Sequence, residues 1–137
     1  MVIAVCSKQE VEYQAIADAI RSYPKREQYV MISRWFPSVA EYRDTHLKHP
    51  FAVTIFAFDD IDNQELSILV HRTSEESQIV WVGEDKRFSI ASYRVRAANF
   101  LMKPITEKEI WISLDRCIKR LQEEHAIDGY DCVNIRE

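Results

Sequence analysis

Residues 79–106 have the sequence IVWVGEDKRFSIASYRVRAANFLMKPIT, and the pattern of this stretch is the clearest indication of the fold. Two short apolar runs, Ile79–Val82 and Phe100–Met102, flank the segment Phe88–Ala98, which is predicted to form a helix. Apolar runs of this length are typical of strands buried on both faces of a parallel sheet, with a helix as the crossover between them. The stretch therefore predicts one strand–helix–strand unit.

The same alternation extends to both ends of the chain. The helical segments carry apolar residues at three- and four-residue spacing, and two of them begin with Ser or Thr followed three residues later by Glu, a capping signature. The predicted strands are Val2–Cys6, Tyr29–Ile32, Ala52–Phe58, Ile79–Val82 and Phe100–Met102, and the predicted helices begin near Gln9, Ser38, Asp62, Phe88 and Thr106. Five such units predict an α/β domain with a doubly wound, five-stranded parallel sheet.

Composition disfavours several classes of function. At 137 residues the chain has the size of one domain, and its net charge of −4 gives no general attraction to nucleic acid. Two glycines are too few for a glycine-rich phosphate loop, and three cysteines without CxxC spacing suggest neither a disulfide framework nor a zinc site. The histidines share no metal-ligand spacing, so we expect no metal and no cofactor. Because no apolar run approaches the roughly 20 residues of a membrane span, we expect a cytoplasmic protein without membrane contact.

The Lys103-Pro104 pair anchors a resemblance to a known family. Residues 79–106 resemble the fourth strand, fourth helix and fifth strand of response-regulator receiver domains, most of all receivers attached to LytTR-type DNA-binding domains. The resemblance covers residues 1–122 and implies the (βα)₅, flavodoxin-like receiver architecture with strand order 2-1-3-4-5. Residues 123–137 are then expected to be a linker or the start of a following LytTR-like DNA-binding domain.

The resemblance also implies what the chain has lost. A working receiver holds Mg²⁺ with two carboxylates after the first strand and with the aspartate that ends the third strand and accepts the phosphoryl group. Those positions here are Ser7, Lys8 and Phe56, Gly83 stands in place of the switch hydroxyl, and Lys103 alone is retained. Because Mg²⁺ needs oxygen ligands and phosphoryl transfer needs a nucleophile, we expect a pseudo-receiver that signals without phosphorylation and is not an enzyme.

A receiver that is not phosphorylated needs a constitutive surface. The resemblance implies the face formed by the fourth helix, fifth strand and fifth helix, with Tyr93, Arg94, Phe100, Trp111 and Leu114 as candidate interface residues. Aromatic residues and arginine are enriched in interfaces. We expect a protein partner or a homodimer through this face, and DNA contact only through a following domain of a transcription regulator.

Two other hypotheses stay open. A phosphorylatable receiver could use a displaced aspartate, Asp59 or Asp60, after a register slip, whereas the plainer interpretation of these residues is a solvated loop with Asp62 as a helix N-cap. An unrelated flavodoxin-like small-molecule binder would also fit the alternation, although the hydroxyl-rich or glycine-rich loops such ligands need are lacking.

Overall fold

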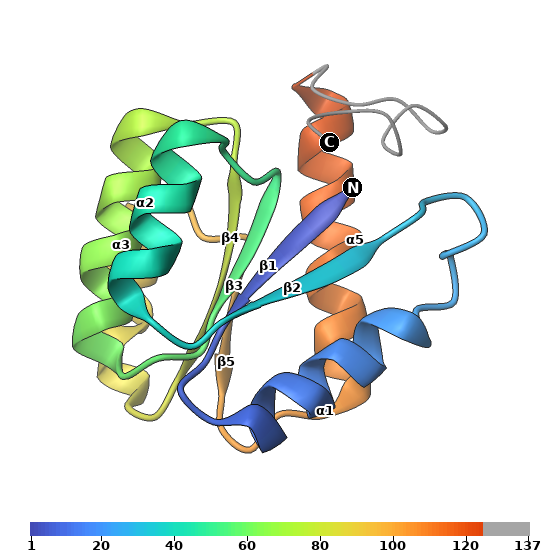
Figure 1. Cartoon of the computed structure of the whole chain (residues 1–137), viewed down its shortest axis with the longest axis horizontal. Helices are drawn as coiled ribbons and strands as arrows, with labels where there is room; N and C mark the ends of the chain where they lie inside the picture. The colour runs from blue at the N-terminus through green and yellow to red at the C-terminus, as the bar shows by residue number, and fades with distance from the viewer. Residues whose placement is uncertain (125–137) are drawn as a thin grey trace.

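Five parallel strands form one sheet in the order β2-β1-β3-β4-β5 (Figure 1). The structure, a computed structural model, describes residues 1–124. In chain order the elements are β1 (Val2–Cys6), α1 (Glu10–Arg21), β2 (Ile32–Phe36), α2 (Val39–Lys48), β3 (Val53–Phe56), α3 (Asp60–Thr73), β4 (Gln78–Gly83), the 3₁₀ turn η1 (Lys86–Phe88), α4 (Ser89–Arg94), β5 (Asn99–Met102) and α5 (Glu107–Glu123). The predicted fold class and strand order are confirmed.

Helices cover both faces of the sheet, and each face has its own apolar core. Figure 1 shows α1 and α5 on one side of the sheet and α2 and α3 on the other. Because side chains alternate along a strand, Ile3 and Val5 of β1 join the core under α1 and α5, whereas Ala4 and Cys6 join the core under α2 and α3. Two buried faces explain why the strands are almost wholly apolar.

The strand register brings the carboxyl ends of the strands to one edge of the sheet. Cys6 at the end of β1 lies opposite Phe56 at the end of β3, and Phe56 lies opposite Trp81. Gly83, the last residue of β4, lies opposite Met102 at the end of β5. Loops that follow these strand ends therefore meet, and this is the edge where open α/β sheets place their sites.

Side-chain caps start three of the helices. Ser38 accepts a hydrogen bond from the Glu41 amide at the start of α2, and Thr106 forms a capping box with Glu109 at the start of α5, as predicted. The predicted start of α3 near Asp62 was wrong, because the helix begins at Asp60 and its N-cap is Asp59. The Asp59 side chain accepts from the Asp62 amide at 2.8 Å, so the helix starts two residues earlier than its apolar pattern indicates.

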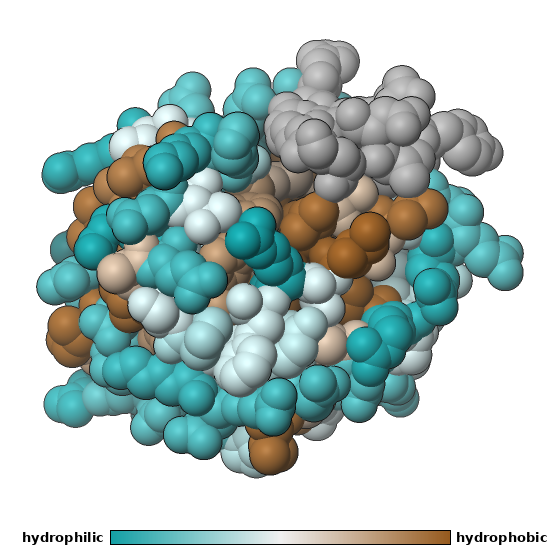
Figure 2. All heavy atoms as spheres, in the orientation of Figure 1, coloured by the Kyte–Doolittle hydropathy of each residue, from teal (hydrophilic) through white to brown (hydrophobic). Residues whose placement is uncertain are grey.

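The second strand is displaced from its prediction. It runs over Ile32–Phe36, not Tyr29–Ile32, because β2 is an edge strand with exposed or half-exposed residues at most positions and so has a weak apolar pattern. Tyr29 is buried in the preceding loop, where its hydroxyl accepts from Gln122 Nε2 at 2.8 Å. On the face seen in Figure 2, apolar side chains gather near β2, where Val30 and Ile32 are exposed.

The fourth helix is shorter than predicted. It covers Ser89–Arg94, whereas the pattern predicts Phe88–Ala98. The backbone of Arg96 has φ 56°, in the left-handed region, which ends the helix and turns the chain back toward β5. Within residues 1–124 no helix is both long and apolar enough to cross a membrane.

Candidate functional site

The five residues that the resemblance singles out lie at the carboxyl edge of the sheet. Ser7 and Lys8 follow β1, Phe56 ends β3, Gly83 ends β4, and Lys103 follows β5. Topology brings these positions together because all five strands are parallel and point toward the same edge. We call this region, with the charged side chains that reach it, the strand-end edge.

Lys103 is held by groups of its own chain. Its ammonium donates to the Ala57 carbonyl at 3.2 Å and forms ion pairs with Glu12 Oε2 at 3.3 Å and Glu84 Oε1 at 3.4 Å. The side chain is only 22% exposed, so these partners supply the counter-charge that a largely buried ammonium needs. Glu84 follows β4 directly, whereas Glu12 comes from α1.

Glu12 reaches the strand-end edge because it lies in the first turn of α1, which starts at Glu10 soon after β1 ends. Its other carboxylate oxygen, Oε1, accepts from the Ser7 hydroxyl at 2.6 Å. Ser7 is fully buried, and its oxygen also accepts from the Gln9 amide at 3.1 Å. The spacing of five residues between Ser7 and Glu12 is the signal in the sequence, because one helical turn after the strand returns the carboxylate toward the strand end.

Lys8 points away from this network. Its ammonium lies 3.8 Å from Asp62 Oδ2 at the start of α3, and the side chain is mostly exposed. Burial raises the pKa of Asp62, and the negative charge of neighbouring Asp59 raises it further, while Lys8 acts in the opposite direction. An exposed pair of this kind contributes little to stability.

Phe56 is a core residue and offers no chemistry. Its side chain is fully buried under α2 and α3, and its ring packs edge-on against Tyr42 with 5.2 Å between centroids. Such aromatic pairs stabilise a core beyond their simple burial. The end of β3 therefore presents the Ala57 carbonyl to Lys103 and no side-chain oxygen.

Asp60 fills the space beside Gly83. This buried carboxylate accepts from the Trp81 indole N–H at 3.0 Å through Oδ1 and from the amides of Glu84 and Asp85 at 3.1 and 3.0 Å through Oδ2. A Cβ added at Gly83 would lie 2.5 Å from Asp60 Oδ1. The missing side chain at residue 83 thus makes room for an internal carboxylate that pins the loop after β4.

A second buried polar side chain fastens the same loops. Asn63, in the first turn of α3, accepts from the Phe58 amide at 3.0 Å and donates to the Val82 carbonyl at 3.1 Å. It therefore ties the end of β3 to the end of β4. No signal in the sequence identifies Asn63 or Asp60 in these roles, because both depend on contacts between separate loops.

The carboxylates at the strand-end edge do not fit Mg²⁺. Both oxygens of Glu12 and both oxygens of Asp60 already accept hydrogen bonds or ion pairs from the chain. Mg²⁺ demands an octahedron of hard oxygen ligands, and here an ammonium lies among the acids instead. Within residues 1–124 no group of three or more His, Cys, Asp or Glu side chains is arranged to hold a metal ion.

The candidate interface residues are not gathered on one surface. Leu114 is 1% exposed and belongs to the core under α5, which corrects its assignment to a surface. Trp111 packs toward α1, where its indole N–H donates to the Ala19 carbonyl at 2.9 Å. Phe100 is half-buried against Trp81, so Tyr93 and Arg94 on α4 are the two candidates that are exposed.

Comparison with known proteins gives the class of fold. No family model and no curated protein matches the sequence. Solved structures do match: the BeF3-activated receiver domain of DrrB from Thermotoga maritima superposes with TM-score 0.67 at 14% identity, over 86% of this chain and 97% of that one. The response regulatory domain of mrkE from Klebsiella pneumoniae gives TM-score 0.69 at 13% identity, over 90% and 99%.

A third match is HP1043, an orphan response regulator of H. pylori, with TM-score 0.68 at 10% identity over 88% of this chain and 96% of that one. Sequence identities this low support a shared fold only, so the chemistry of the site has to be argued from its own residues. The described part of the chain therefore has the flavodoxin-like receiver fold.

Proposed function

We propose that this chain is a pseudo-receiver, a signalling domain of the two-component type that acts through protein contacts and without phosphorylation. The proposal rests on one observation: the charged side chains at the strand-end edge already have ion-pair and hydrogen-bond partners within the chain. Lys103 pairs with Glu12 and Glu84, and the Asp60 carboxylate accepts from the loop after β4. A phosphoryl group at this edge would have to displace these internal partners, and no side chain there is placed as an acceptor with a metal beside it.

The alternative acceptors are both engaged. Asp59 caps α3, and Asp60 is 8% exposed with three N–H donors on its two oxygens. Lys103, the cation expected to contact a phosphoryl group, is paired with other acids. A displaced aspartate would therefore lose helix capping or loop contacts on modification, which favours the phosphorylation-independent hypothesis.

The wider context rests on resemblance alone. The sequence similarity to receivers of LytTR-type regulators supports a role within a transcription regulator, with residues 1–122 as the receiver and DNA contact made by a following domain. Residues 123–137, which are expected to be a linker or the start of such a domain, lie outside the described residues from residue 125 onward. A protein partner or a second copy is the expected binding partner of the receiver portion.

The direct test is incubation with acetyl phosphate and Mg²⁺, followed by intact-mass analysis. We expect no phosphoryl adduct on this chain, because the edge offers no metal cage, Asp60 is buried among its donors, and exposed Asp59 is the N-cap of α3. The DrrB receiver domain, treated in parallel, is the positive control. A Mg²⁺-dependent adduct that maps to Asp59 or Asp60 would overturn the proposal in favour of a displaced acceptor.

A further inference from the structure

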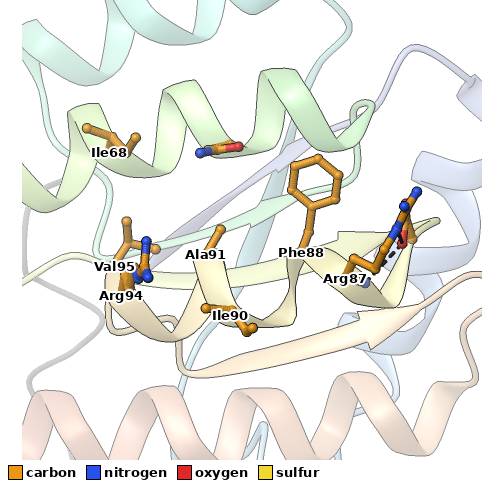
Figure 3. A pocket seen from close by; sticks show the side chains of 9 residues that line it. Ile68, Arg87, Phe88, Ile90, Ala91, Arg94 and Val95 are labelled. Atoms are coloured by element: carbon orange, nitrogen blue, oxygen red, sulfur yellow. Dashed lines mark hydrogen bonds and ion pairs between the residues drawn. The ribbon is translucent and has the colours of Figure 1, made fainter.

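A groove lies between α3 and α4 on the opposite side of the molecule from α1 and α5. It has a volume of about 690 Å³, and we define this α3–α4 groove by Gln64 and Ile68 of α3 and by Phe88, Ala91, Arg94 and Val95. Figure 3 shows Phe88 and Ala91 pointing toward α3, and Ile68 of α3 lying near the other end of the groove, where Val95 and Arg94 are found. Its floor is therefore apolar.

The groove exists because α4 is short and carries a small residue toward α3. The helix has six residues, and Ala91 at its middle leaves space that a larger side chain would fill. Beyond the groove floor, Ile90 is 64% exposed at the rim. Apolar side chains at a concave surface favour a partner that can remove them from water.

Cations lie at both ends of this apolar floor. Arg94 is exposed at the Val95 end and makes no ion pair or hydrogen bond within residues 1–124. At the other end Arg87 is held by Asp85, with 2.7 Å between Nη2 and Oδ2, and its guanidinium is mostly exposed (Figure 3). Exposed Lys86 adds a further positive charge there. This local excess of positive charge contrasts with the net charge of −4 of the whole chain.

We propose that the α3–α4 groove binds an acidic amphipathic helix of a partner protein, an inference that rests on the proposed function as an interaction domain. The apolar face of such a helix would cover Ile68, Phe88 and Ala91, and its carboxylates would meet Arg87 and Arg94. The two arginines lie at opposite ends of the groove (Figure 3), so one carboxylate near each end of the partner helix could meet them.

The combination of floor and rim favours a protein over a nucleic acid. A phosphate backbone would pair with the arginines and leave the apolar floor exposed to water. An amphipathic helix would bury the floor and pair with the arginines at the same time. The electrostatic contribution guides encounter and orientation, and burial of the floor supplies most of the affinity. The predicted partner segment therefore has apolar residues at i, i+3, i+4 and i+7 with acids beside them.

The test uses the full chain as bait for a phage-displayed library of random peptides. Enriched peptides are synthesised with a fluorophore and measured by anisotropy against wild type, Arg94→Glu and the charge-matched control Arg43→Glu, which lies on α2 outside the groove. We expect enriched peptides to be acidic and amphipathic, Arg94→Glu to weaken binding by at least about tenfold, and Arg43→Glu to change it less than about twofold. Added salt should also weaken binding.

Three outcomes would overturn the proposal. The first is a selection that enriches no peptide, and the second is peptide binding that Arg94→Glu leaves unchanged. The third is a dimer in sedimentation velocity that Arg94→Glu dissociates, because the occupant would then be a second copy of the chain. A failure here leaves the acetyl phosphate result standing, whereas phosphorylation of a chain that still binds acidic peptides would refute only the pseudo-receiver function.

Discussion

Charged side chains at the strand-end edge have partners within the chain, whereas Arg94 in the α3–α4 groove is exposed. At the edge, Lys103 and Asp60 each have several partners from their own chain. In the groove, Arg94 is exposed without a partner among residues 1–124, next to an apolar floor. The charged groups at the strand-end edge are thus paired within the chain, whereas the proposed binding groove keeps Arg94 exposed beside apolar side chains.

The two regions share one loop. Asp60 holds the amides of Glu84 and Asp85, and Asp85 in turn holds Arg87 at one end of the groove. The internal carboxylate therefore fixes the position of a rim residue that a partner would meet.

The largest effect is expected from Asp60→Ala. The change leaves the buried Trp81 indole N–H and two loop amides without their acceptor, which should lower the free energy of unfolding by about 3 kcal/mol. Urea unfolding measures it. Asp59→Ala is the matched control, because it removes a neighbouring carboxylate whose one described role is to cap α3, at a cost of about 1 kcal/mol. Equal losses for the two variants would contradict the pinning role of Asp60.

Acid should weaken the fold from a site remote from both regions. His46 is fully buried, and burial lowers its pKa from 6.5 to about 4. Its Nδ1 accepts from the Phe51 amide at 3.2 Å, which leaves Nε2 to donate to the Ser74 hydroxyl at 2.8 Å. The neutral ring is thus part of the packing between α2 and α3.

The direction of this pH effect follows from the pKa values of His46 in the unfolded and the folded chain. Between pH 6.5 and about 4 the unfolded chain binds a proton at His46 that the folded chain does not, so stability is complete above pH 6.5 and falls with pH. The loss should reach about 2 kcal/mol at pH 5. Urea unfolding at pH 7 and pH 5 measures this, and His46→Gln should reduce the difference. Comparisons of the edge and the groove are therefore cleanest above pH 6.5.

A smaller effect is expected from Gly83→Ala. The added Cβ would approach Asp60 Oδ1 to 2.5 Å and the Phe100 ring to 3.1 Å, so the carboxylate must shift away from its donors. We expect a loss of about 1 to 2 kcal/mol by urea unfolding. In the double variant with Asp60→Ala the alanine should cost much less, since its main obstacle is gone. Simple additivity would show that Asp60 and Gly83 do not act together.

The order of strands and helices could be predicted from the sequence, whereas the bounds of β2 and α4 could not. Strand and helix order was visible because buried parallel strands are almost wholly apolar, and the Lys103-Pro104 pair anchored the strand-end positions. Edge strand β2 and the short α4 were misplaced, because exposure weakens one pattern and the turn at Arg96 ends the other.

The site was harder than the fold for a physical reason. The absence of carboxylates at Ser7, Lys8 and Phe56 is a property of single positions and can be seen in the sequence. The replacement network through Glu12 and Asp60 depends on how loops approach one another, and apolar periodicity carries no record of that. Leu114 shares the apolar stripe of α5 with Ile110 and Ile118, which are buried, so its spacing indicated the core, and its assignment to a surface followed the family resemblance instead.

The smallest effect on stability is expected from Arg94→Glu. Because the side chain is exposed and has no partner within residues 1–124, the free energy of unfolding should change by less than about 0.5 kcal/mol. The same variant should abolish most peptide binding, so the groove is predicted to be important for binding and dispensable for folding. A loss of stability comparable with that of Asp60→Ala would remove the contrast between the two regions.

The pseudo-receiver function is tested most directly by an NMR titration with Mg²⁺ and beryllofluoride, monitored at the amides of Glu84 and Asp85 and at the Trp81 indole N–H. These three groups donate to Asp60, so they report any rearrangement of the strand-end edge. We expect their resonances to stay in place at Mg²⁺ and beryllofluoride concentrations that shift those of the DrrB receiver domain. Saturable, Mg²⁺-dependent shifts of these three signals would refute the pseudo-receiver function.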